Sequence, residues 1–174
     1  MATSSPIISW LGSDLSVLSK LQFSSQEGSF SAVVADEESV VAKVVIANNF
    51  TKGVAAEQAV MDATDCQLKV TAVDGTTEAP VVKERWIRAK CTSNGDSDYT
   101  RLGLLNSEEV KLNISAGDSS RPNTIGGDAN DGTSKNSGNN LAEVDLMARP
   151  DLNTAATGGL QQFRLVLLYS YGAQ

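Results

Sequence analysis

Alternation of apolar and polar residues is the main regularity along the chain. Residues 66–72, CQLKVTA, place an apolar side chain at every second position and a polar one between. A period of two is typical of a β-strand with one buried face. The same pattern predicts strands over 85–91, 110–114 and 142–148. Asp74-Gly75 after the strand 66–72 and Asn94-Gly95 after the strand 85–91 are turn signals.

The C-terminal segment 163–171, FRLVLLYSY, gives the strongest strand signal. Its second face is also partly apolar because of Val166 and Leu168. Such a strand belongs either in the middle of a sheet or at a subunit contact. The Val- and Ile-rich segment 40–47 also predicts a strand, a weak alternation predicts one over 20–24, and residues 7–10 are a candidate for a short edge strand.

Helical patterning is confined to the Ala-rich segment 55–63, which is expected to form two turns and is too short to build a helical layer. Short strands separated by Gly, Asn and Asp predict an all-β fold, an antiparallel β-sandwich of about seven or eight strands with little helix, either immunoglobulin-like or jelly-roll-like. We expect one domain over residues 1–174, with a short N-terminal arm over 1–17.

A long polar segment interrupts the strands at about residues 117–140, and its second half reads GGDANDGTSKNSGNN. A loop of this length in a compact domain indicates function, disorder or a domain boundary. The 34 residues that follow it are too few for an independent domain, so they are expected to complete the same sandwich. The segment is therefore predicted to be an excursion at one end of the sandwich, with packing against a neighbouring subunit as an open alternative.

The loop matches an EF-hand only in part. With Asp128 at position 1, Asn130 suits position 3, but positions 5, 6 and 12 carry Gly, Thr and Asn instead of an oxygen ligand, glycine and glutamate. An irregular calcium site on Asp128 and Asp131 is the alternative to a solvated turn. We expect the turn, and no metal or other cofactor.

Composition narrows the function classes. The formal net charge of −7 disfavours nucleic-acid binding, because an acidic surface repels phosphates. The chain has no histidine, which removes the commonest general base and metal ligand. No apolar run is long enough to span a membrane and the start lacks the features of a signal peptide, so folding in a cytoplasm is expected.

The two cysteines, Cys66 and Cys91, fall in predicted strands. Two buried reduced thiols are the expected state in a cytoplasm, with a cross-strand disulfide as the alternative if the two strands pair.

Candidate catalytic groups are limited to carboxylates. Residues 36–38 (Asp-Glu-Glu) and the pair Glu108-Glu109 offer them, but neighbouring positions on a strand point to opposite faces. A carboxylate glycosidase is thus kept only as an alternative, and we expect no enzyme. Trp86 and Tyr99 would either join a carbohydrate-binding platform or cap the core, and the core is preferred.

Three stretches together resemble the small virion structural proteins of tailed bacteriophages and prophages. They are the strand 85–90 with its polar sequel 94–99, the Gly/Asn/Ser-rich loop, and the closing strand 164–171. The resemblance implies a virion protein without chemistry, made in the bacterial cytoplasm. It favours a capsid decoration protein that binds the major capsid protein as a homo-oligomer, with a trimer suggested by local three-fold capsid sites. A tail or baseplate protein that binds host polysaccharide is the alternative.

Attachment is expected to use apolar strand edges and loops. In 85–91 the alternation places Trp86 on the same face as Arg88 and Lys90, where it would shield their aliphatic stems or contact a partner. The predicted contact surface comprises the N-terminal strand and the region around Trp86, namely Ile7, Ile8, Trp10, Leu11, Trp86 and Tyr99.

Overall fold

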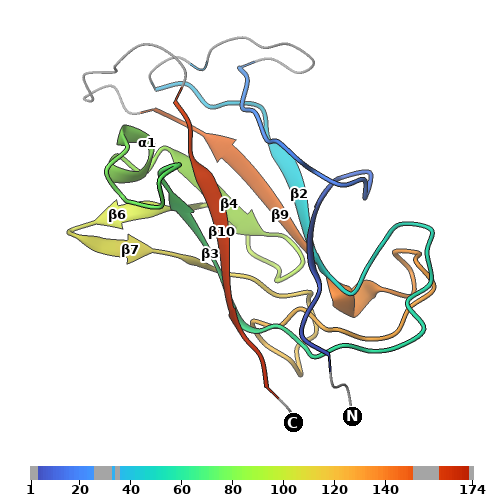
Figure 1. Cartoon of the computed structure of the whole chain (residues 1–174). Helices are drawn as coiled ribbons and strands as arrows, with labels where there is room; N and C mark the ends of the chain where they lie inside the picture. Colours follow the sequence, from blue (N-terminus) through green and yellow to red (C-terminus); the bar gives the residue numbers. More distant parts are fainter. Residues whose placement is uncertain (1–3, 26–32, 34–35, 151–160, 173–174) are drawn as a thin grey trace.

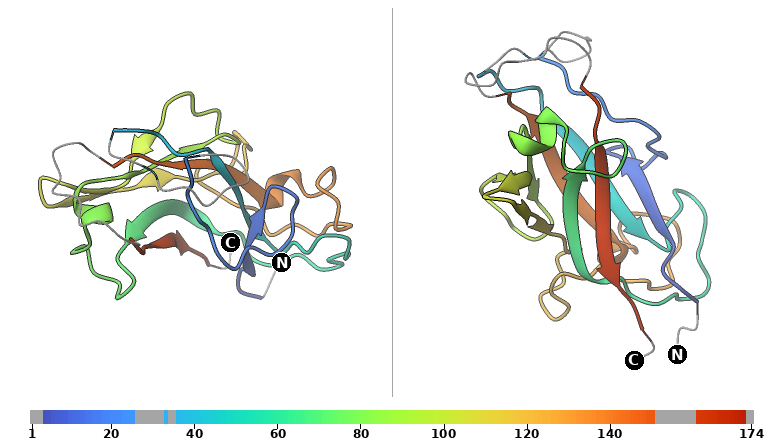
Figure 2. Two further views of the ribbon diagram at one scale, coloured as in Figure 1. Left: turned by 90° about the horizontal axis from the view of Figure 1, so that it is seen from above. Right: turned by 60° about the vertical axis from the view of Figure 1, so that its left-hand side comes forward.

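The alternating segments form two antiparallel sheets that face each other across a hydrophobic core (Figure 1). The computed structural model describes residues 4–25, 33, 36–150 and 161–172. The larger sheet has the order β1-β2-β9-β4-β5, and the smaller sheet has the order β10-β3-β8. Seen from above, the two sheets lie in separate layers (Figure 2). The all-β sandwich prediction is confirmed.

The elements have the following bounds. The larger sheet contains β1 (Ile8–Gly12), β2 (Ala42–Asn48), β4 (Ile87–Cys91), β5 (Thr100–Arg101) and β9 (Leu141–Ala148). The smaller sheet contains β3 (Thr64–Thr71), β8 (Leu112–Asn113) and β10 (Arg164–Ser170). A separate hairpin joins β6 (Gly103–Leu105) to β7 (Glu108–Val110), and the helices are the short α1 (Pro80–Lys83) and the 3₁₀ turn η1 (Gly138–Asn140).

Most of the predicted strands are confirmed. The segments expected over 40–47, 66–72, 85–91, 142–148 and 163–171 correspond to β2, β3, β4, β9 and β10, and the expected edge strand over 7–10 corresponds to β1. The segment 110–114 is divided between β7 and β8, because the chain leaves the hairpin at Lys111 and joins the smaller sheet. This division and the very short β5 and β6 explain why the described residues form ten strands in place of seven or eight.

Two weaker predictions were wrong. Residues 20–24 form no strand, although Leu21 and Phe23 pack against the core. Residues 55–63 form no helix, because Ala56 and Ala63 form β-bridges to Asn130 and Ile125 of the polar loop. Tertiary hydrogen bonding thus overrides the helical preference of alanine at this place.

The core is built from the inward positions of both sheets. On β3, Cys66 and Leu68 are fully buried, whereas Gln67 between them is only partly buried. The larger sheet is also covered on its outer face near β1, where a second cluster forms from Leu11, Val45, Ala47, Phe50 and Leu141. This double covering explains why β2 reads as a continuous apolar run.

Both cysteines are buried free thiols. Cys66 lies on β3 in the smaller sheet and Cys91 on β4 in the larger sheet, so their strands do not pair and no cross-strand disulfide forms. Burial raises the pKa of the Cys66 thiol to about 12. A thiol so rarely ionised is a packing group and not a nucleophile.

No helix in the described part of the chain has the length and hydrophobicity that crossing a bilayer requires.

Candidate functional site

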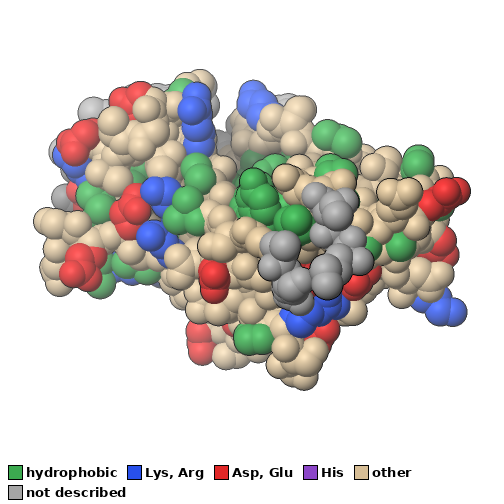
Figure 3. All heavy atoms as spheres, turned by 60° about the horizontal axis from the view of Figure 1, so that its bottom comes forward, with side chains coloured by type: hydrophobic (Ala, Val, Ile, Leu, Met, Phe, Trp, Pro, Cys, Tyr) green, Lys and Arg blue, Asp and Glu red, His purple; other side chains and the backbone are tan. Residues whose placement is uncertain are grey.

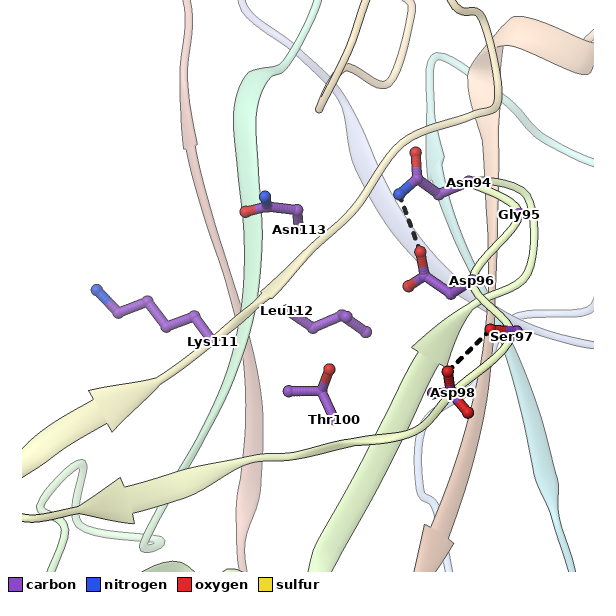
Figure 4. A pocket seen from close by; sticks show the side chains of 9 residues that line it. All are labelled: Asn94, Gly95, Asp96, Ser97, Asp98, Thr100, Lys111, Leu112 and Asn113. Carbon is purple, nitrogen blue, oxygen red and sulfur yellow. Dashed lines mark hydrogen bonds between the residues drawn. The ribbon is translucent and has the colours of Figure 1, made fainter.

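A polar cleft opens between the turn that follows β4 and the strand β8 (Figure 4). It has a volume of about 520 Å³. Its lining is formed by Asn94, Gly95, Asp96, Ser97, Asp98, Thr100, Lys111, Leu112 and Asn113. The cleft therefore offers amide, carboxylate, hydroxyl and ammonium groups with little apolar surface.

Several of these groups are already engaged within the chain. One carboxylate oxygen of Asp96 accepts the Cys91 backbone N–H at 3.0 Å, and the other accepts Asn94 Nδ2 at 3.0 Å. Ser97 donates to Asp98 at 2.9 Å. Asp96 thus closes the turn after β4, and its carboxylate is a structural group.

The glycosidase candidates lie outside this cleft and have other partners. Glu109 on β7 is 2.9 Å from Lys69 Nζ and 3.9 Å from Lys111 Nζ. Glu108 precedes it on the strand and faces Leu105 in the pairing register. Among the described residues, no group of three or more His, Cys, Asp and Glu side chains converges as a metal ion would require.

The predicted contact residues divide into exposed and buried groups. Ile7 is 55% exposed, and Ile8 and Trp10 are partly buried against the core. The exposure expected for Leu11 was wrong: it is 2% exposed, because it points to the opposite face of β1 from Trp10 and enters the second cluster.

The orientation expected for Trp86 was also wrong. Trp86 is only 7% exposed and belongs to the main core. The strand alternation does not extend to it, because Arg85 has a left-handed backbone (φ 56°) and β4 begins at Ile87. Tyr99 is partly buried, with Lys90 Nζ 4.8 Å from its ring centroid. Trp86 is therefore too buried to form part of a carbohydrate-binding platform, and its interpretation as a core residue is confirmed.

One side of the sandwich, between the edges formed by β1 and β10, is only partly covered by the residues that the structure describes. We call it the open side, and it is defined by partly buried apolar side chains that pack on the core: Ile8, Trp10, Leu18, Leu21, Phe23, Phe163, Leu165 and Leu167. Phe23 and Phe163 stack there with ring centroids 5.7 Å apart.

The C-terminal strand lies at this side. β10 pairs only with β3 among the described strands, so it is an edge strand and not a central one. Tyr169 near the end of β10 is 39% exposed, and Tyr171, which follows the strand, is 54% exposed. In Figure 3, hydrophobic side chains gather near the middle of the face shown, with charged groups mostly around them. The expected position in the middle of a sheet was wrong, and the subunit contact stays a prediction.

The polar loop is held by buried asparagines that the sequence patterns did not single out. Asn48 Nδ2 donates to the carbonyls of Met61 and Ile125, and Asn140 Nδ2 donates to those of Asn48 and Asp128. Asn49 Nδ2 donates to the carbonyls of Gln58 and Gly127. The loop is thereby fastened to residues 48–63 of its own chain. The only available signal was the Asn-Asn pair directly after a strong strand.

One arginine forms ion pairs with aspartates of this loop and of the segment beside it. Arg121 lies 2.9 Å from Asp118, 3.3 Å from Asp62 and 3.1 Å from Asp128. Partial burial alone would lower the pKa of Arg121, but its hydrogen bonds to Asp118 and Asp128 raise it above the usual range. Asp131 instead accepts hydrogen bonds from the backbone and hydroxyl of Thr133. The two carboxylates considered for calcium therefore have separate protein partners.

Asp118 should contribute to the acid limit of stability. Hydrogen bonds from Ser120 and then Arg121 lower its pKa from 3.8 to about 2. A carboxyl group with a lowered folded-state pKa stabilises the protein above its unfolded pKa, and the contribution disappears as pH falls through the folded value. We expect Asp118→Asn to flatten the loss of stability between about pH 4 and pH 2. Urea midpoints measured from pH 2 to 7 would show this, and parallel curves for the two proteins would contradict it.

Comparison with protein-family models, with curated proteins and with solved structures gave no match for this chain.

Proposed function

We propose that the protein is a non-enzymatic structural component of a tailed-phage particle, a decoration protein that binds the major capsid protein as a homo-oligomer. The observation that carries the proposal is the open side of the sandwich. Apolar side chains of β1, of the segment after it and of β10 are only partly covered there. Edges and apolar margins of this kind are surfaces through which β-domains bind other chains.

The internal engagement of the polar groups supports an assembly role. Asp96 holds its own turn, and Glu109 lies between two lysines. These carboxylates have partners within the chain, whereas Ile7, Tyr169 and Tyr171 are exposed apolar side chains. The exposed Ile7 and the aromatic pair Tyr169 and Tyr171 suit the core of a protein–protein interface, where aromatic side chains are enriched.

Imaging of particles with and without the protein tests the proposal. Particles that lack it should regain density on the capsid shell when the purified chain is added. The Ile7→Asp/Tyr171→Asp variant should bind less, because it places charges in the contact surface, whereas Thr133→Asp in the polar loop should bind normally. Failure of the wild-type protein to bind shells at all would refute capsid decoration.

The polar cleft favours a second candidate, a tail or baseplate protein that binds host polysaccharide. Sugar hydroxyls pair well with the amides and carboxylates that line it. A glycan array and imaging of the tail tip test this candidate. Glycan binding that is lost in Asp98→Ala, together with density at the tail tip, would favour it over decoration. The absence of any glycan bound by the wild-type protein would count against it.

A further inference from the structure

The strand β10 is the longest edge of the two main sheets. The edge strands β5 and β8 have two residues each, which limits what they can pair with. The edge strand β1 has five residues, and its outer edge is partly covered by its own chain, because the N–H of Leu18 donates to the carbonyl of Trp10 and Leu11 bridges Val17. β10 has seven residues and, within the described ranges, one neighbouring strand.

The outer face of the smaller sheet has an unusual distribution of side chains. In the pairing register, Val166 of β10 lies beside Lys69 of β3, and Leu168 lies beside Gln67. The polar residues thus occupy the inner strand and the apolar ones the edge. Proteins that remain monomeric protect long edges in the opposite way, with charged residues, proline or bulges on the edge strand.

We propose that β10 pairs antiparallel with β10 of a second copy of this chain, joining the two smaller sheets into one continuous sheet. This inference rests on the proposed function and adds to it, because it names the partner of β10 within the proposed oligomer. A two-fold axis brings the same edge of both copies together and closes the assembly as a dimer. It replaces the trimer expected from capsid geometry.

The sequence of β10 is complementary to itself in this arrangement. With the two-fold axis at Leu167, Val166 faces Leu168 of the second copy, and Leu165 faces Tyr169. Cross-strand pairs of aliphatic and aromatic residues stabilise antiparallel sheets. Arg164 is the only charged residue of β10 and faces Ser170, so no like charges meet. A strongly charged partner would find no matching charges along the strand, whereas a second copy places apolar residues opposite each other from Leu165 to Tyr169.

Two double variants test the pairing at the same two positions. Val166→Glu/Leu168→Glu, the like-charge variant, places glutamates opposite each other across the two-fold axis. Val166→Glu/Leu168→Lys, the opposite-charge variant, removes the same apolar side chains but places glutamate opposite lysine. In both, the new Glu at 166 lies beside Lys69 of its own chain. Circular dichroism and thermal unfolding of the full-length chains establish that both variants fold.

The mass of each protein in solution, measured by light scattering across a range of concentrations, gives the readout. We expect the wild-type chain and the opposite-charge variant to be dimers, and the dissociation constant of the like-charge variant to rise by about tenfold or more. A wild-type monomer or trimer would overturn the proposal, as would equal dimerisation of the two variants. Two folded monomeric variants would overturn the register.

Particle binding is measured separately, so the two proposals can fail independently. A wild-type monomer that still binds capsid shells would refute β10 pairing and leave decoration standing. A dimer that binds no shell would refute decoration and leave β10 pairing standing.

Discussion

Replacing Asn48 by alanine is expected to lower the free energy of unfolding by about 3 kcal/mol. The Asn48 side chain is fully buried and makes three hydrogen bonds to backbone groups of other segments. Its Nδ2 donates to the carbonyls of Met61 and Ile125, and its Oδ1 accepts the N–H of Ile7 at 2.9 Å. Alanine would remove a hydrogen-bond partner from the Ile125 carbonyl in a buried region, and from the Met61 carbonyl and the Ile7 N–H in a partly buried one. A buried group left without a partner costs roughly 1–3 kcal/mol.

A matched asparagine controls for the substitution itself. Asn139 is an exposed residue of η1, and Asn139→Ala should change the unfolding free energy by less than about 0.5 kcal/mol. Urea unfolding of the two variants and the wild-type protein provides the comparison. A similar small loss in both variants would show that the Asn48 amide does not hold the loops together.

Individual strands were predictable from the sequence, whereas their neighbours in the sheet were not. The strands β3 and β9 follow from residues 66–72 and 142–148 alone, because a period of two needs no knowledge of the partner strand. Their neighbours do not follow, since β9 lies between β2 and β4, which are separated from it by long stretches of chain. Long-range pairing leaves no periodic signal in one sequence.

The errors at Trp86 and at residues 55–63 have local and tertiary causes respectively. One left-handed residue, Arg85, changed the phase of the alternation and turned Trp86 into the core. Ala56 and Ala63 adopt extended bridges because the polar loop lies beside them, and the loop lies there because asparagine amides hold it. For β10, the sequence alone predicted apolar residues on both faces of the strand. Its position at the edge of a sheet could be known only from the order of the strands in the structure.

The loop itself should prove to be a rigid part of the domain, and Gly127→Ala tests this. Gly127 is buried, and a Cβ atom there would lie 2.4 Å from the Val60 carbonyl oxygen and 2.8 Å from that of Met61. The backbone cannot shift easily, because its carbonyl accepts the Val60 N–H and its N–H donates to Asp62, both within 2.9 Å. We expect a loss of about 3 kcal/mol in the unfolding free energy, at the upper end of overpacking costs.

The same loop provides the control, because a Cβ at Gly138 would have no heavy atom within 4 Å. Gly138→Ala should therefore be neutral or slightly stabilising, through a smaller entropy of the unfolded chain. Hydrogen exchange adds a local readout: in Gly127→Ala the amides of Ala56 and Asn130, which bond each other's carbonyls, should lose protection more than those of the central strand β9. If Gly127→Ala instead unfolds with the wild-type midpoint and unchanged protection, the loop yields to the new methyl group and is not fixed on the segment 48–63. If the loop is fixed by its own chain, residues 117–140 need no neighbouring subunit to order them, and the proposed assembly contact is then to be sought at β10 and the open side.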